Sequence, residues 1–271
     1  MIVIVIAGLL VYLALRPSPL AQRPTGCVAG PATQGVQLSP SQAAIAAVIA
    51  GVANERGMPT RAVAIAYATA LQESKLANLH YGTMDSVGVF QQRPSEGWGT
   101  AQQIEDPVYA AGRFFAALAQ VPHYQRLPIY EAAQDVQHSA DGSAYMNYEQ
   151  QAAGMSGPFT GGAPHAVWCW YPQDSSTAPQ ITPLRDELVR TFGQLAVQQG
   201  AGGSAASSAP AADVRVRYRA AGWAVASWLV THATAYGISN VRYAGYQWNE
   251  TAGNRGWTPD PSAPSGSVEL R

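Results

Sequence analysis

Residues 70–76 read ALQESKL, and residues 88–94 read GVFQQRP, so that Gly88 follows Glu73 by fifteen positions. The first stretch closes an Ala-rich, helically spaced pattern that predicts a helix from Thr60 to Leu76. The second stretch stands within residues 77–103, where repeated Gly and Pro predict a long irregular segment. Long loops inside compact domains are usually functional. The sequence therefore places Glu73 where a helix meets a loop of this kind.

Further helices are predicted on both sides of this pair. Ser39 and Gln42 form a Ser-x-x-Gln capping box, which predicts a helix start, and Pro107 marks another start after an Asp cap. Two more helices are expected near 129–139 and 143–153. Residues 38–160 are thus predicted to form one all-helical domain.

The N-terminal residues form an apolar run from Ile2 to Leu15 that Arg16 closes. A membrane-spanning helix needs about 17–25 apolar residues, and the core of a signal peptide about 7–15. We interpret residues 1–16 as an export signal or a single membrane anchor, and the two remain open. Residues 17–37, rich in Pro and Gly, are interpreted as a linker. Both readings place the rest of the chain outside the cytoplasm.

The composition excludes some functions and suggests one covalent link. A formal net charge of -1, with only 12% charged residues, gives no electrostatic footprint for nucleic acid. The five histidines lack metal-ligand spacing, so neither a metal nor a cofactor is predicted. Export would permit a disulfide between Cys27 and Cys169, which flank the helical domain. The alternative is two unrelated free thiols.

The C-terminal part has a different pattern. Residues 161–212 are predicted to be a linker with one helix near 184–197, and they end in a stretch of Gly, Ala and Ser. Residues 213–271 then alternate strand and helix patterns, which predicts a small α+β module. The expected fold class is α+β, with an all-helical domain followed by this module.

Glu73 has two interpretations. Most glutamates near a helix end are solvated, and Lys75 could pair with this one. Its helical neighbours Ala66, Thr69 and Ala70 are small, however, and the helix ends at an irregular loop, so Glu73 could instead be a general acid. A general acid has to hold a proton near neutral pH, which a partly buried site favours.

The two motifs in this order resemble lytic transglycosylases and the related goose-type lysozymes. The matching residues are Glu73, Ser74, Leu76, Gly88, Val89, Phe90, Gln91 and Pro94. The longer stretch 68–100 is similar to exported actinobacterial cell-wall proteins. The resemblance implies a lysozyme-like fold in which Glu73 stands at the floor of a cleft and the Gly-x-x-Gln segment lines its wall.

The resemblance also implies an activity. Such enzymes cleave the β-1,4 bond between N-acetylmuramic acid and N-acetylglucosamine in peptidoglycan with one Glu as acid and base. They form 1,6-anhydromuramyl ends and use no cofactor. The residues expected to contact the glycan strand are Ser86, Gly88, Gln91, Gln92, Trp98, Gln134 and Tyr145. Trp98 is as well suited to core packing as to stacking on a sugar.

Asp85 and a missing tyrosine motif both bear on the expected transglycosylase activity. Asp85 could be a second carboxylate that positions water, which would make the enzyme a hydrolase, or it could shape a turn. Many transglycosylases also carry an Ala-Tyr-Asn-Ala-Gly segment whose Tyr orients the acid. The counterpart at 132–137 has no Tyr, so Gln134 or Tyr145 would have to supply that hydrogen bond.

The C-terminal module is similar to a domain of actinobacterial wall proteins related to zinc peptidases of the D-Ala-D-Ala type. Its last strand, near 268–270, lacks the His-x-His pair that binds metal in such peptidases. A non-catalytic module for wall binding or protein contact is therefore expected. The alternative function for the whole chain is a catalytically weak glycan-binding or assembly protein with partners in the cell envelope.

Overall fold

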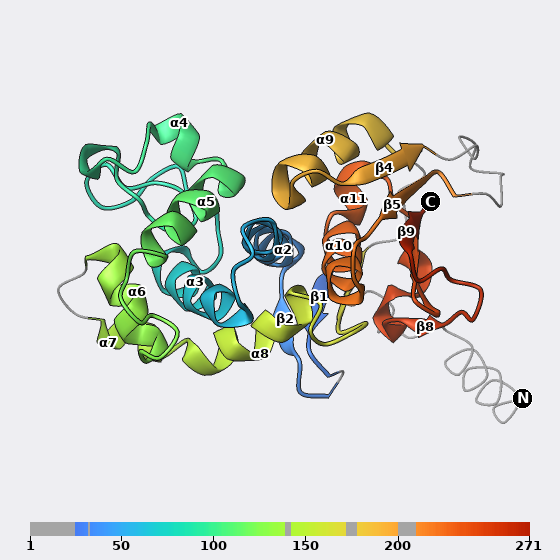
Figure 1. Cartoon of the computed structure of the whole chain (residues 1–271), viewed down its shortest axis with the longest axis horizontal. Helices are drawn as coiled ribbons and strands as arrows, with labels where there is room; N and C mark the ends of the chain where they lie inside the picture. The colour runs from blue at the N-terminus through green and yellow to red at the C-terminus, as the bar shows by residue number, and fades with distance from the viewer. Residues whose placement is uncertain (1–24, 32, 139–141, 172–177, 200–209) are drawn as a thin grey trace, which may run out of the picture.

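The computed structural model confirms the α+β class and places helices and sheets in two regions (Figure 1). It describes residues 25–31, 33–138, 142–171, 178–199 and 210–271. The helical region lies on the left of Figure 1, and the larger sheet lies on the right with the C-terminus. Helix α2 runs between them.

The predicted all-helical region is confirmed across its described residues. Its helices are α2 (Pro40–Glu55), α3 (Thr60–Ser74), α4 (Ala101–Ile104), α5 (Pro107–Leu118), α6 (Ile129–Gln137), α7 (Ser143–Met146) and α8 (Glu149–Phe159), with the 3-10 helix η2 (Pro94–Glu96). The single helix predicted for 143–153 is wrong, because α7 ends at Met146 and α8 starts at Glu149.

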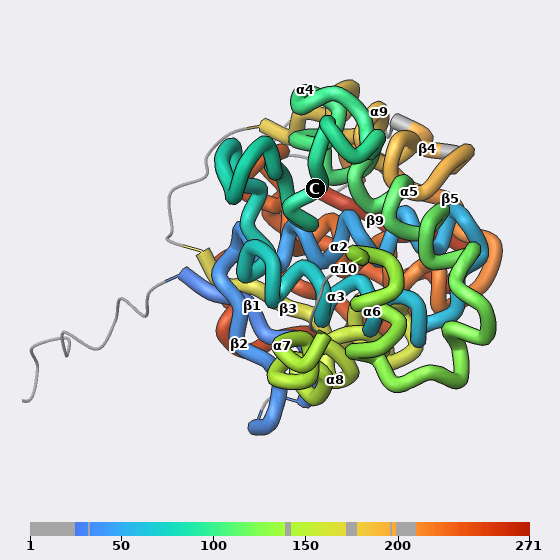
Figure 2. Tube along the Cα trace, turned by 90° about the vertical axis from the view of Figure 1, so that its left-hand side faces the viewer, coloured from blue at the N-terminus to red at the C-terminus, as the bar shows by residue number. Residues whose placement is uncertain are grey.

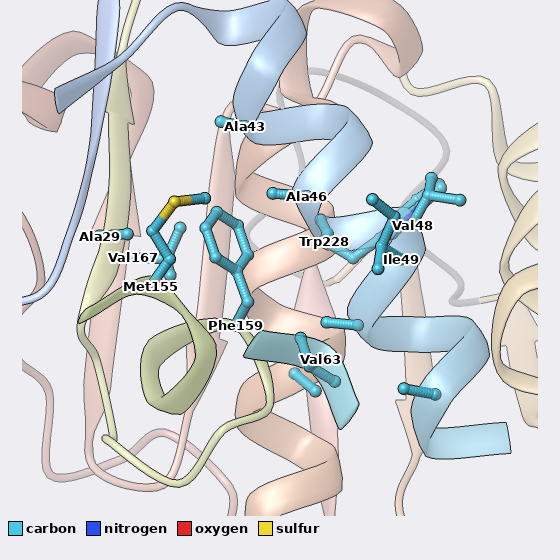
Figure 3. Packing of buried hydrophobic residues seen from close by; sticks show 14 of the residues in the cluster. Ala29, Ala43, Ala46, Val48, Ile49, Val63, Met155, Phe159, Val167 and Trp228 are labelled. Carbon is cyan, nitrogen blue, oxygen red and sulfur yellow. The ribbon is translucent and has the colours of Figure 1, made fainter. Parts of the chain in front are cut away.

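Helix α2 forms the shared core of the molecule. Ser39 caps it in the predicted box, accepting from Gln42 N while the Gln42 side chain accepts from Ser39 N. Its middle consists of small and aliphatic residues that are buried on every side, so both regions pack against it. Figure 3 shows Ala46 and Ile49 of this helix amid apolar side chains from other elements, including Phe159 and Trp228.

A three-stranded antiparallel sheet corrects both predicted linkers. Strands β1 (Gly26–Ala29) and β2 (Val36–Leu38) lie within the segment interpreted as the first linker, and β3 (Val167–Trp170) lies within the second. The strand order is β2-β1-β3. The alternation of these short strands is masked in the sequence by flanking Pro and Gly, which made the segments look irregular.

The predicted disulfide is confirmed. Cys27 and Cys169 lie directly opposite each other in the β1–β3 register, with their Cα atoms 4.0 Å apart and their sulfurs 2.03 Å apart. Both side chains are fully buried. The bridge therefore joins the two ends of the helical region, 142 residues apart in sequence.

The C-terminal module is a six-stranded antiparallel sheet with helices packed on it. Its elements are β4 (Ala196–Gln199), β5 (Ala212–Arg215), α10 (Arg219–Thr231), α11 (Ala233–Tyr236), β6 (Asn240–Tyr243), β7 (Tyr246–Asn249), the 3-10 helix η3 (Glu250–Arg255), β8 (Thr258–Pro259) and β9 (Ser267–Leu270). The strand order is β4-β5-β9-β6-β7-β8. Strand β4 extends the module before the predicted boundary at residue 213. Helix α9 (Ile181–Phe192) ends earlier than predicted and packs on α2.

The module is anchored to the small sheet by two indole groups. Trp248 Nε1 donates to the Cys169 carbonyl at 2.9 Å, and Trp257 Nε1 donates to the Val167 carbonyl at 2.7 Å. Gly253 lies so close that a Cβ there would come within 2.2 Å of the Cys169 oxygen. Strand β3 therefore contacts both the C-terminal module and, through β1, the start of the helical region.

Across the described ranges, no helix has the length and apolar character needed to cross a membrane. The apolar run at 2–15 lies outside those ranges.

Candidate functional site

Glu73 stands in the last turn of α3, the helix that the helical region surrounds. Most residues of α3 from Ala62 to Leu71 are buried, whereas Glu73 is half-buried. The helix ends in an unusual way, because Lys75 and Leu76 both adopt left-handed backbone conformations, with φ of 59° and 57°. Such conformations cost L-residues roughly 1–2 kcal/mol each, so the surrounding packing must impose this turn. The turn leaves Glu73 at an open helix end.

Ser74 ties this helix end to the loop that carries the second motif. Its hydroxyl donates to the Val89 carbonyl at 2.7 Å and accepts from Ala77 N at 3.1 Å. The Ser74 side chain is buried, so these bonds lie away from bulk water, where an unmade bond would be costly. The two sequence motifs are therefore in direct contact.

Tyr145 supplies the hydrogen bond to Glu73. Its hydroxyl donates to Glu73 Oε1 at 2.6 Å, from helix α7 and across 72 residues of sequence. The Tyr145 side chain is only 2% exposed, so its ring is fixed by packing. A fixed donor to Oε1 helps to hold the planar carboxyl group of Glu73 in one orientation.

Gly88 fits a position that only glycine can occupy. Its φ is +79°, and a Cβ there would lie 2.5 Å from the Ile104 carbonyl oxygen. Its N–H donates to the Leu79 carbonyl at 2.6 Å. Gly88 thus shapes the loop wall through its backbone.

Gly88→Ala is expected to lower the free energy of unfolding by about 2–4 kcal/mol, from left-handed strain together with the clash against Ile104. Gly97→Ala is the matched control, because Gly97 has φ of +80° but no atom within 4 Å of the added Cβ. It should lose only the strain, about 1–2 kcal/mol. Urea denaturation of both variants measures the difference. Equal losses would contradict the close approach of Ile104.

Three other predicted contact residues make hydrogen bonds inside the protein, two within the loop and one to helix α5. Ser86 Oγ donates to the Thr83 carbonyl at 2.8 Å and reaches Gln91 Oε1 at 3.2 Å. Gln91 Nε2 donates to the Gly88 carbonyl at 3.2 Å. Gln92 is 2% exposed, and its Nε2 lies 3.4 Å from the Ala110 carbonyl. Ser86 and Gln92 are thus both buried and hydrogen-bonded within the protein, and their contact with glycan stays a prediction.

The Asp85 carboxylate accepts hydrogen bonds from two other residues of the loop. Its Oδ1 accepts from Arg93 Nε at 2.8 Å and from Ser95 Oγ at 2.9 Å, and its Oδ2 accepts from Ser95 N at 2.8 Å. The hydrogen bond from Arg93, followed by that from the Ser95 backbone, lowers the pKa of Asp85 to about 2. Asp85 is therefore a weak base that closes a turn between residues 85 and 95.

Trp98 lines a cleft of about 490 Å³ between η2, α5 and the end of α6. Tyr109 Oη donates to the Trp98 carbonyl at 3.1 Å, and Arg113 donates to the Gly97 carbonyl at 3.1 Å, which hold the backbone here. The lining residues are Glu96, Gly97, Trp98, Arg113, Ala116, Ala117, Gln137 and His138.

Gln137, which lines the cleft, is hydrogen-bonded to the segment that carries the second motif. Gln137 Nε2 donates to the Phe90 carbonyl at 2.8 Å, and the preceding residue, Val89, is the one that Ser74 binds. Glu73 itself is not among the residues that line the cleft. Figure 2 shows α6 and α7 beside α3 on one side of the molecule.

Sequence reasoning missed Arg113, Gln137 and His138. The only signal for Gln137 and His138 was their place at the end of the expected helix 129–139. Arg113 lies on an exposed face of α5, where a cation ordinarily contacts only solvent. Gln134 was predicted, and it lies next to a neighbouring hollow of about 720 Å³ that shares Ala117 and His138 with the cleft.

Within the described residues, no three His, Cys, Asp or Glu side chains are grouped to hold a metal ion. No protein-family model matches the chain, and a search of curated proteins found no match either.

Proposed function

We propose that the helical region is a lysozyme-like domain that cleaves the β-1,4 bond between N-acetylmuramic acid and N-acetylglucosamine in peptidoglycan. Glu73 is the proposed acid and base of a lytic transglycosylase. The observation that carries the proposal is the hydrogen bond from Tyr145 to Glu73 at 2.6 Å. An acid that protonates a leaving oxygen needs a fixed orientation, and a buried tyrosine provides it.

The proposed reaction needs one carboxyl group. With Oε1 held by Tyr145, Glu73 Oε2 delivers a proton to the leaving glycosidic oxygen, and the C1–O bond breaks. The substrate's N-acetyl oxygen assists at C1. The Glu73 carboxylate then takes the proton from the muramyl 6-hydroxyl, whose oxygen bonds to C1. Glu73 ends protonated as it began, and no water is consumed.

Asp85 favours this route over hydrolysis. A hydrolase that inverts or uses a second carboxylate needs that group to activate water or to attack carbon. Three hydrogen bonds hold the Asp85 carboxylate, and its pKa of about 2 makes it a poor base. The muramyl hydroxyl is therefore the preferred nucleophile in this proposal.

The buried disulfide supports an extracytoplasmic location, because structural disulfides persist in oxidising compartments. We propose that the chain is secreted or tethered by its N-terminal segment, with glycan strands as its principal partner. Envelope proteins remain proposed partners of the C-terminal module, which we regard as non-catalytic.

The direct test adds purified protein to insoluble peptidoglycan and follows both pelleting and release of soluble muropeptides. Release by the wild type supports the enzyme. Pelleting without release would replace it with the alternative, a glycan-binding assembly protein. A protein that neither pellets with peptidoglycan nor releases muropeptides would contradict the enzyme proposal and the binding-protein alternative.

Tyr145→Phe is expected to lower the rate of muropeptide release about 10–100-fold, because the acid loses its orienting bond while its position is kept. Stability should change by no more than about 1 kcal/mol. Tyr148→Phe is the control, since the Tyr148 hydroxyl binds Lys75 instead of Glu73. Equal activity of the two variants would show that Tyr145 has no positioning role.

A further inference from the structure

A second cavity, of about 600 Å³, lies where the helical region, the small sheet and the C-terminal module meet. Its lining residues are Gly30, Pro31, Gly154, Pro158, Ala163, Pro164, His165, Ala166, Trp168, Arg255, Gly256 and Trp257. It shares none of them with the cleft beside Trp98. Its volume falls in the range of about 300–1,000 Å³ that small-molecule sites occupy.

Aromatic rings form part of the lining and are held in place by the protein. Trp257 donates its indole N–H to the Val167 carbonyl at 2.7 Å, so the polar atom of the ring is already satisfied. The His165 ring stacks on Tyr246 with 4.3 Å between centroids. His165 has a left-handed backbone, with φ of 45°, a strained conformation of the kind that clusters at functional sites.

Glycines form another part of the cavity lining. Gly256 has φ of +69°, and a Cβ there would lie 3.3 Å from the Trp168 ring. Gly154 stands in α8 on the opposite element, where an added Cβ would meet only Val36 at 3.6 Å. Two of the lining positions, Gly154 and Gly256, therefore contribute backbone and no side chain to the cavity.

The cavity lining contains a positively charged residue and no acidic one. Arg255 is exposed and makes no ion pair or side-chain hydrogen bond with the described residues. No acidic residue lines the cavity. Burial, with a smaller contribution from Arg219, lowers the pKa of His165, and Arg255 is the one arginine among the lining residues. An uncompensated guanidinium beside aromatic rings favours a ring compound that carries a carboxylate.

We propose that this cavity binds a carboxylate-bearing amino sugar, the muramyl residue of a glycan strand that carries no stem peptide there, with its ring against Trp257 and Trp168 and its free lactyl carboxylate at Arg255. The choice of sugar rests on the proposed function of Glu73. The site would hold a strand at a place separate from the cleavage site, which gives the C-terminal module a role in substrate retention.

The test measures binding by titration calorimetry with the disaccharide N-acetylglucosaminyl-N-acetylmuramic acid, and with neutral chitobiose as the comparison. Arg255→Ala removes the charge. Gly154→Leu fills the cavity from a helix position with room for a side chain. Gly157→Leu is the matched control, because it lies in the same helix, is absent from the lining and has nothing within 4 Å of an added Cβ.

Arg255→Ala and Gly154→Leu are each expected to weaken binding of the muramyl disaccharide about tenfold or more, while Gly157→Leu binds as wild type does. Equal binding by all variants would overturn the proposal, as would equal binding of chitobiose. Binding that depends on Arg255 without muropeptide release would overturn catalysis but keep this site. Muropeptide release without Arg255-dependent binding would overturn this site but keep the proposed catalysis by Glu73.

Discussion

Glu73→Gln is expected to lower the rate of muropeptide release about 10²–10⁴-fold, which is the usual contribution of a general acid. Glutamine has nearly the same shape and can still accept the hydrogen bond from Tyr145 through its amide oxygen. It has no proton to give the leaving oxygen and cannot take one from the muramyl hydroxyl. The loss should therefore appear in turnover, with binding and stability kept.

Glu55→Gln is the matched control, because Glu55 ends α2 in an exposed position on another side of the helical region. It should release muropeptides at the wild-type rate. The measurement is the initial rate of release from purified peptidoglycan, with pelleting as the measure of binding. A Glu73→Gln protein that keeps wild-type rates would remove Glu73 from the chemistry.

Removal of the disulfide should have the largest effect on stability. Cys27→Ala together with Cys169→Ala opens a loop whose ends are 142 residues apart, which is expected to lower the free energy of unfolding by about 2–5 kcal/mol. At this chain length each kcal/mol shifts Tm by about 2–4 °C, so a fall of roughly 4–20 °C is expected. Alanine avoids placing hydroxyl groups in a fully buried site.

Thermal unfolding of the double variant, compared with wild type in the presence and absence of reductant, measures this effect. Reduced wild type should unfold near the temperature of the double variant, and reductant should leave the variant unchanged. Unchanged Tm in the variant would mean that the packing of Trp248 on the Cys169 carbonyl holds the two regions without the bridge.

The helices were predictable because their signals are local. The capping box at Ser39 and the Asp-Pro start before α5 each depend on neighbouring residues, and each appears in the structure. Strands β1, β2 and β3 were not predicted as strands, since a strand of three or four residues among Pro and Gly gains its identity only from its partner. The cysteines gave the one indication that β1 and β3 meet.

The residues of the candidate site also differ in how far local sequence could predict them. Glu73 and Gly88 could be placed from their motifs, because each needs a particular local backbone. Tyr145 could be named only as one of two candidates, since its hydrogen bond joins α7 to α3 through tertiary packing. Ser86 and Gln92 were predicted to contact substrate from their residue types, and the structure adds that Ser86 bonds to the loop backbone and Gln92 to helix α5. Residue type alone does not reveal whether a polar side chain faces its own backbone or the solvent.

The most direct test of the central proposal is mass analysis of the sugar ends that the wild-type protein releases from purified peptidoglycan. Transglycosylation by Glu73 predicts 1,6-anhydromuramyl ends, each lighter by one water than a hydrolysis product, and their loss in Glu73→Gln. Reducing muramic acid ends in place of anhydro ends would contradict the single-carboxylate route and would require a water-activating group. Anhydro ends that persist in Glu73→Gln would contradict the role of Glu73 itself.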